Sequence, residues 1–121
     1  MNLTFQKSPL SSVKADAAVA FLHEDAALLK QEMRDLNRQF KNSLSPIIES
    51  GDFRGKEKEV AVLYLGNAFQ TKKLVLVGVG EKKKLTLEKY RRAAAAGAKR
   101  AQSLNARSIA FELPSTASEK D

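Results

Sequence analysis

The sequence predicts an α/β fold built on a mixed sheet of about five strands. Residues 74–79 form a continuous apolar run without polar alternation, which is typical of a strand covered on both faces. Between Leu87 and Leu104, apolar and small residues recur three and four positions apart, which is typical of one face of a helix. A buried strand, a short turn and a packed helix form the unit from which α/β cores are built.

The N-terminal part of the chain predicts an edge strand, a more interior strand and a helix. Leu3 and Phe5 alternate with polar residues, as in a strand with one solvated face at a sheet edge. Residues 17–22 are apolar on both faces, as in an interior strand. After Asp25, a candidate N-cap, apolar residues follow helical spacing up to Phe40. This helix and the next are expected to cover one face of the sheet.

A short helix and another strand are predicted next. Ser45 can cap the helix, with Pro46 as its first residue and Gly51 at its end. Residues 59–65 are apolar on both faces and predict an interior strand. Residues 66–72 are too few for a helical crossover, so this strand is expected to run antiparallel to the following one. The sheet is therefore expected to be mixed.

The helix that starts near Leu87 is expected to lie close to the sheet, because the middle of its apolar stripe contains only Ala and Gly. Thr86 is placed to be its N-cap, with Leu85 and Tyr90 as a hydrophobic staple. Burial of Leu87 and Tyr90 is expected to contribute about 1.5–3 kcal/mol each. That exceeds the roughly 0.3–1 kcal/mol that each lysine near the helix N-terminus costs. The stripe consists of Leu87, Tyr90, Ala94, Gly97, Ala101 and Leu104.

The size and the end of the chain indicate one domain over residues 1–121. A composition of 43% hydrophobic and 29% charged residues suits a globular domain that buries about two thirds of its unfolded surface. Residues 108–113 predict a last strand, which Pro114 ends. The small and polar residues 114–121 are expected to form a frayed tail.

The sequence contains no cysteine, which excludes disulfides, thiolate metal ligands and cysteine nucleophiles. The first residues lack the apolar core of a signal peptide, and no apolar run approaches the length of a membrane span. A cytoplasmic location without membrane contact is therefore expected.

The net charge of +7 is concentrated between Lys72 and Arg100, where ten basic residues stand against Glu81 and Glu88. Such a run is typical of solvated surface, but it also offers contacts for phosphate groups, whose binding weakens with salt. Specific base readout is not expected, because Tyr90 is the only aromatic residue among these cations. The candidate anion or nucleic-acid contacts are Lys82, Lys83, Lys84, Lys89, Arg91 and Arg92.

No set of residues indicates catalysis or metal binding. His23 is the only histidine, and a zinc site needs several convergent ligands, so a surface or capping histidine is expected. No serine lies in a Gly-x-Ser-x-Gly turn with a histidine base available. Glu57 and Glu59 are interpreted as surface charges where a strand begins. Catalytic, cofactor-binding and metal-binding residues are therefore predicted to be absent.

Gly78 and Gly80 end the central strand, at the edge where open α/β sheets bind ligands. A dinucleotide fingerprint needs a third glycine at position 83, where this chain has Lys83. Glycines are also expected here because the chain must turn sharply beneath a closely packed helix. The structural interpretation is favoured over nucleotide binding.

Four stretches of the chain together resemble a known family. Each stretch alone is a weak signal, but the four occur in register and in order. They are Gly51–Lys56, Lys73–Lys83, Leu85–Ala94 and Phe111–Pro114. Across nearly the whole chain this set resembles the N-terminal domain of the leucyl aminopeptidases, the cytosolic M17 metallopeptidases.

The resemblance implies a macro-domain-like, three-layer α/β/α sandwich joined, in the full enzyme, to a C-terminal catalytic domain. In that family the catalytic domain holds two divalent metals, Zn or Mn, and builds the core of a homo-hexamer that acts on peptides. The family's metal-binding motif, Asn-Thr-Asp-Ala-Glu-Gly-Arg, is absent here, so no catalytic or metal residue is carried over. The chain is expected to be an N-terminal domain truncated at its C-terminal end.

Two hypotheses follow. The first is a non-catalytic N-terminal domain of a metal-dependent leucyl aminopeptidase, whose missing domain releases N-terminal amino acids, leucine type, from peptides. The alternative is a free-standing module that uses its basic face to bind nucleic acid or a phosphorylated ligand. The resemblance strengthens the alternative slightly, because some bacterial members of the family bind DNA.

Overall fold

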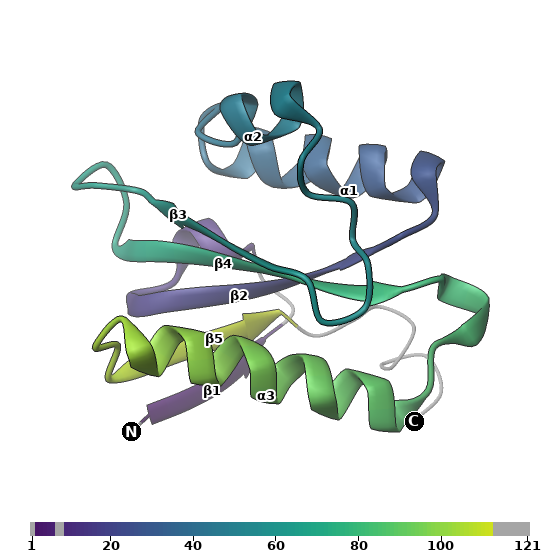
Figure 1. Cartoon of the computed structure of the whole chain (residues 1–121). Helices are drawn as coiled ribbons and strands as arrows, with labels where there is room; N and C mark the ends of the chain where they lie inside the picture. Colours follow the sequence, from purple (N-terminus) through teal and green to yellow (C-terminus); the bar gives the residue numbers. More distant parts are fainter. Residues whose placement is uncertain (1, 7–8, 113–121) are drawn as a thin grey trace.

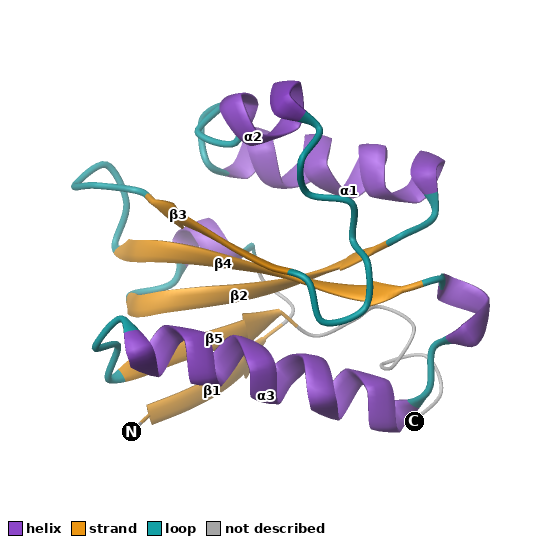
Figure 2. Ribbon diagram, in the orientation of Figure 1, coloured by secondary structure: helices purple, strands orange, loops and turns teal. Residues whose placement is uncertain are grey.

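The computed structural model describes residues 2–6 and 9–112, and Figure 2 shows its helices and strands. Two of the helical segments are short 3₁₀ turns, labelled η. The expected strand residue Leu113, Pro114 and the expected tail lie outside the described residues. The elements are, in chain order, β1 (Asn2–Gln6), η1 (Leu10–Ser12), β2 (Ala15–His23), α1 (Ala26–Gln39), α2 (Ser45–Ser50), β3 (Val60–Tyr64), β4 (Thr71–Gly80), η2 (Lys82–Lys84), α3 (Leu87–Ser103) and β5 (Ser108–Glu112).

One sheet with strand order β1-β5-β2-β4-β3 forms the middle layer of the domain. All neighbouring strands are parallel except β3, which runs antiparallel to β4. Helices α1 and α2 cover one face of the sheet, and α3 covers the other (Figure 1). The prediction of a mixed five-stranded sheet between helical layers is confirmed, as is the antiparallel pairing of β3 with β4.

Both faces of the central strand β4 are buried, as its unbroken apolar run predicts. Alternate side chains of a strand point to opposite faces. Leu74 and Leu76 therefore pack in the core beneath α1, while Val75 and Val77 pack in the core beneath α3. All four side chains are fully buried.

Helix α3 lies close to the sheet, as its small residues predict. Ala93 and Ala101 are buried, and a Cβ atom on Gly97 would lie 2.8 Å from Cγ1 of Val19 in β2. The cap prediction is also confirmed, because the Thr86 hydroxyl accepts a hydrogen bond from the Lys89 N–H at 3.2 Å.

Leu87 is not part of the core, which corrects the prediction. Its side chain is 65% exposed, whereas Tyr90, one turn later, packs against the core beneath α3. Leu87 is the first residue of α3, separated from η2 by two residues, and the first turn of this helix lies away from the centre of the sheet (Figure 1). The stabilisation expected from burying this side chain therefore does not apply.

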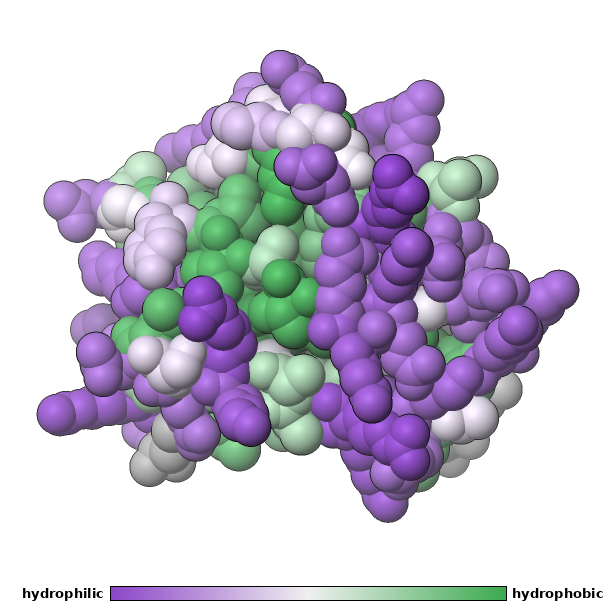
Figure 3. Space-filling view, in the orientation of Figure 1, coloured by the Kyte–Doolittle hydropathy of each residue, from purple (hydrophilic) through white to green (hydrophobic). Residues whose placement is uncertain are grey.

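Strand β3 is an edge strand, so the prediction of an interior strand at 59–65 is wrong. Its apolar pattern has another cause, because both helical layers reach this edge. Ala61 and Leu63 are half-buried against the core on the α1 and α2 side of the sheet, and Val60 and Val62 are half-buried against the core beneath α3. Figure 3 shows apolar surface between the two helical layers.

Strand β1 lies at the opposite edge, as predicted. Leu3 and Phe5 are nevertheless 53% and 55% exposed, because no described element covers them. The Phe5 ring stacks on Phe111 of β5, with 4.8 Å between the ring centroids.

The start of α1 is tied to the start of η2. Asp25 is the N-cap residue of α1, as predicted, but its carboxylate caps no N–H of that helix. It accepts instead a hydrogen bond from the Lys82 N–H at 2.8 Å. The next helix, α2, begins at Ser45, so Pro46 is its second residue and the prediction is off by one. Gly51 ends α2 in the left-handed region with φ 68°, as expected.

Candidate functional site

The predicted basic residues lie on two adjoining elements, but they do not converge on one point. Lys82, Lys83 and Lys84 form η2, and the other three lie in the first two turns of α3. Arg91 and Arg92 are consecutive helical residues, so their side chains leave the helix about 100° apart. Lys84 pairs with Glu81 at 3.4 Å, and Arg92 pairs with Glu88 at 3.3 Å. The basic face is therefore a spread of exposed charges, part of which is already neutralised.

The crevice at the carboxyl ends of β2 and β4 is filled by the loop at residues 53–56. A Cβ on Gly78 would overlap the Lys56 carbonyl oxygen, and one on Gly55 would overlap the His23 carbonyl oxygen. The Gly80 N–H donates to the Gly55 carbonyl at 3.0 Å. These glycines allow one segment of main chain to pack on another, and this accounts for them without a bound nucleotide.

Glu59 fixes the shape of this loop. Its carboxylate accepts hydrogen bonds from the Arg54 N–H at 3.0 Å and from the Lys56 N–H at 3.1 Å. The sequence predicts a surface charge at the start of a strand here, and the structure gives Glu59 this additional role. Backbone donors bound to a charged acceptor make strong hydrogen bonds, so the side chains of Arg54 and Lys56 are held on a well-defined support.

His23 is buried, with 8% of its surface exposed, so the first alternative of the expected surface or capping histidine is wrong. Its Nδ1 lies 2.8 Å from a Glu32 carboxylate oxygen, and its backbone N–H donates to the other oxygen at 2.9 Å. Among the described residues, no three His, Cys, Asp or Glu side chains lie together as metal ligands would. The donor set of this part of the chain therefore does not fit a metal ion.

Glu112, at the end of β5, is a carboxylate in an unfavourable environment. Burial raises its pKa above the ordinary value of 4.5, and the nearby carboxylates of Glu32 and Asp35 raise it further. The folded state therefore binds the Glu112 proton more tightly than the unfolded state does. The ionised side chain destabilises the fold at neutral pH, and this effect is relieved as the pH falls through the folded-state pKa.

We expect Glu112→Gln to raise the urea midpoint of unfolding at pH 7, because it removes the buried charge. The difference from the unchanged protein should shrink as the pH falls through the raised folded-state pKa of Glu112, and it should be lost below the ordinary value of about 4.5, where the side chain is protonated in both states. Urea unfolding followed by circular dichroism between pH 3 and pH 8 measures the effect. Glu49→Gln, at an exposed position of α2, is the matched control and should leave the midpoint unchanged. A lower midpoint for Glu112→Gln at pH 7 would contradict this account.

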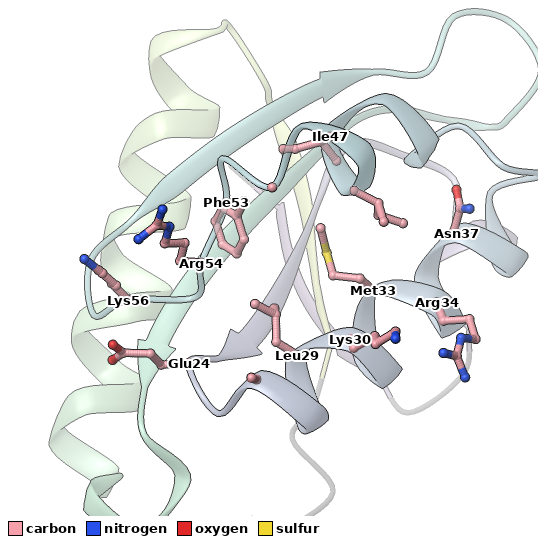
Figure 4. Close-up of a pocket in the computed structure, with 13 residues that line it drawn as sticks. Glu24, Leu29, Lys30, Met33, Arg34, Asn37, Ile47, Phe53, Arg54 and Lys56 are labelled. Carbon is pink, nitrogen blue, oxygen red and sulfur yellow. The ribbon is translucent and has the colours of Figure 1, made fainter.

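A groove of about 700 Å³ lies between α1, α2 and the loop that follows α2 (Figure 4). Its apolar lining includes Met33 and Phe53, which are each 5% exposed, and Ile48, which is 38% exposed. Basic side chains at its rim come from α1 and from the loop. They are Lys30, Arg34, Arg54 and Lys56.

This groove was not predicted from the sequence. Part of it is visible as a pattern in the sequence. Leu29 and Met33 are four positions apart on α1, and so are Lys30 and Arg34. Two parallel rows, one apolar and one basic, therefore run along the same helix. The other side of the groove depends on where α2 and the loop fold, which local periodicity does not reveal.

A protein-family model described as the cytosol aminopeptidase family, N-terminal domain, matches residues 18–121. The chain belongs to this family.

Curated cytosol aminopeptidases align over most of the chain. A probable cytosol aminopeptidase of Nostoc punctiforme is 32% identical over 114 residues, which are 93% of this chain and 23% of that protein. One of Alkaliphilus oremlandii is 27% identical over 111 residues, or 92% of this chain and 22% of that protein. The chain thus spans less than a quarter of the length of these cytosol aminopeptidases. The predicted family resemblance is confirmed.

Solved structures confirm the fold of this cytosol aminopeptidase N-terminal domain. A tomato leucine aminopeptidase mutant superposes with a TM-score of 0.65 at 22% identity, over 92% of this chain and 22% of that one. The macrodomain of Mycobacterium tuberculosis DarG superposes with a TM-score of 0.64 at 13% identity, over 90% of this chain and 74% of that one. The expected macro-domain-like architecture is therefore present. None of the described helices has the length and apolar character needed to cross a bilayer.

Proposed function

We propose that this chain is the non-catalytic N-terminal domain of a metal-dependent leucyl aminopeptidase, which releases N-terminal amino acids, leucine type, from peptides. The observation that carries the proposal is the family match over residues 18–121, in a chain that spans less than a quarter of its curated relatives. The donor chemistry of the described residues supports it, because they bring no metal-ligand set together. The two divalent metals, Zn or Mn, then belong to the catalytic domain.

The same proposal places the parent enzyme in the cytoplasm as a homo-hexamer that acts on peptide substrates. The N-terminal domain then contributes to assembly or to substrate access. Its fold supports a scaffold role, because the crevice at the strand ends is occupied by the chain's own backbone.

An assay of leucine amide hydrolysis tests the proposal. The purified chain, given Mn²⁺ or Zn²⁺, is expected to show no turnover, whereas the product of the reading frame extended past Asp121 is expected to be active and metal-dependent. Activity of the isolated chain that is removed by His23→Ala or Glu32→Gln, with the fold intact by circular dichroism, would show that the chemistry resides in this domain. An extended reading frame without the Asn-Thr-Asp-Ala-Glu-Gly-Arg motif would also contradict the proposal.

A second candidate function is the binding of nucleic acid or a phosphorylated ligand by the basic face. The observation that favours it is that Lys82 and Lys83 are exposed and make no ion pair within the described part of the chain. The absence of a convergent arrangement limits such binding to sequence-independent phosphate contacts.

For this second function we expect Lys82→Ala, Lys83→Ala and Lys84→Ala combined to weaken duplex DNA binding. The slope of log affinity against log salt should fall by about 0.9 for each lysine that contacts a phosphate. Fluorescence anisotropy with labelled duplex DNA at several salt concentrations measures this slope. Combined alanine changes at the exposed Lys14, Lys72 and Lys99 remove the same charge elsewhere and serve as the control. Equal losses in both variants, or no binding at low salt, would exclude a site on η2.

A further inference from the structure

We propose that the groove between α1, α2 and the following loop binds an acidic amphipathic helix of a partner protein. The groove consists of an apolar floor with basic side chains on two sides, as Figure 4 shows. This assignment is independent of the peptidase activity, and it rests on other residues than those of the basic face.

The shape and lining of the groove suit an apolar ridge. Its volume is about 700 Å³. Met33 and Phe53 close the floor, while Leu29 and Ile47 are half-buried and Ile48 is 38% exposed on the α2 side. A partner that fills the groove would remove this remaining apolar surface from water, which is favourable by about 25 cal/mol for each Å² buried.

The spacing of the side chains on α1 favours a helical partner. Leu29 and Met33 are one turn apart, and Lys30 and Arg34 form a neighbouring row with the same repeat. A second helix that lies along α1 presents its own side chains at the same interval of about one turn. Its apolar residues would then meet Leu29 and Met33 while its acidic residues meet Lys30 and Arg34.

The charges of the rim favour an acidic partner and place its acids on both flanks. Lys30 and Arg34 lie on the α1 side of the groove, while Arg54 and Lys56 lie on the loop on the opposite side (Figure 4). Glu24 is the only acidic residue among those that line it. All four cations are exposed, and none makes an ion pair with a described residue. An amphiphile with a single anionic group would pair with the cations on only one of these two sides.

The loop side of the groove is held in place before any partner binds. The Glu59 carboxylate fixes the backbone at Arg54 and Lys56, and Gly55 packs against the His23 carbonyl. A fixed support reduces the conformational entropy that binding would otherwise cost.

Fluorescence anisotropy with a labelled synthetic helix tests the proposal. The probe carries Leu on one face and Glu on both flanks, and a matched probe carries Lys in place of Glu. We expect the chain to bind the Glu probe, with affinity that falls as salt is added, and to bind the Lys probe at least about tenfold more weakly, since like charges repel across an interface. Equal affinity for both probes would overturn the proposal.

Variants of the chain locate the site. Lys30→Glu combined with Arg34→Glu should lower the affinity for the Glu probe at least about tenfold and restore binding of the Lys probe. Ile48→Ser should lower the affinity for the Glu probe without changing the salt dependence of that affinity, because Ile48 carries no charge. Lys14→Glu combined with Lys99→Glu, two exposed positions outside the groove, is the charge-matched control and should have a smaller effect. An equal loss in the control variant would show that net charge alone drives binding.

Competition experiments distinguish the occupant. In the first experiment, dodecanoate competes with the Glu probe at equal concentration. If it displaces the probe, and if its affinity falls in the variant Lys30→Glu with Arg34→Glu, the groove belongs to a small amphiphile and the proposal is overturned. If duplex DNA displaces the probe and this displacement depends on the same two residues, the groove binds nucleic acid and the proposal is also overturned. Failure of both competitors, with displacement by the unlabelled Glu probe, is the expected result.

Discussion

Gly78→Ala is expected to lower the free energy of unfolding by about 3 kcal/mol, the upper part of the range for overpacked cores. A Cβ at this position would overlap the Lys56 carbonyl oxygen and approach the Gly55 carbonyl carbon within 2.5 Å. These are main-chain atoms that cannot turn aside as a flexible side chain would. The Gly78 N–H and carbonyl also bond to Glu59 and Lys58, so the two segments cannot simply separate. Urea unfolding followed by circular dichroism measures the loss.

The control for this variant is Gly51→Ala. Gly51 has φ 68° and nothing within 4 Å of its Cβ position, so alanine there meets backbone strain without a clash. We expect this control to lose about 1–2 kcal/mol. A loss at Gly78 no larger than the loss at Gly51 would mean that the loop at 53–56 does not press on β4.

Gly97→Val is expected to lower the free energy of unfolding by about 2–3 kcal/mol, because it places a branched side chain between α3 and the sheet. The Cβ alone would lie 2.8 Å from Cγ1 of Val19 and 3.2 Å from Cγ2 of Val77. Both valines are fully buried and have stiff side chains, so α3 must move outward. Differential scanning calorimetry and urea unfolding measure the loss.

Ala95→Val is the matched control for Gly97→Val. Ala95 lies on the exposed side of the same helix, so valine there changes helix propensity by about 0.5 kcal/mol and meets no core residue. If both variants lost the same free energy, α3 would not be pressed onto β2 and β4.

Much of the fold could be predicted, because the spacing of apolar and small residues within a segment shows which of its faces are buried. The two-sided apolar run of β4 and the Ala and Gly stripe of α3 each state which faces are covered. The position of a strand in the order of the sheet, at an edge or in the interior, cannot be derived from this spacing. Strand β3 is apolar on both faces because helices cover both, and nothing in residues 60–64 states whether one or two strands pair with it.

The candidate sites were harder to predict, because they depend on residues that are brought together from several elements. His23 is buried, and its ring nitrogen Nδ1 bonds to the carboxylate of Glu32 on α1. The groove forms only when α1, α2 and the loop are in place, and in the sequence its loop cations are visible only as part of the family stretch Gly51–Lys56. The basic face was found from sequence because consecutive lysines are visible without any knowledge of tertiary structure.

The loop at 53–56 has a consequence for how the domain reaches its folded state. Many α/β proteins leave the ends of their strands open and gain stability when a nucleotide or sugar phosphate binds there. In this domain main-chain atoms of Gly55 and Lys56 take up that space, so the native form is complete without a small molecule. The melting temperature of the domain should accordingly be the same before and after exhaustive dialysis, and it should not change when ADP-ribose or NAD is added.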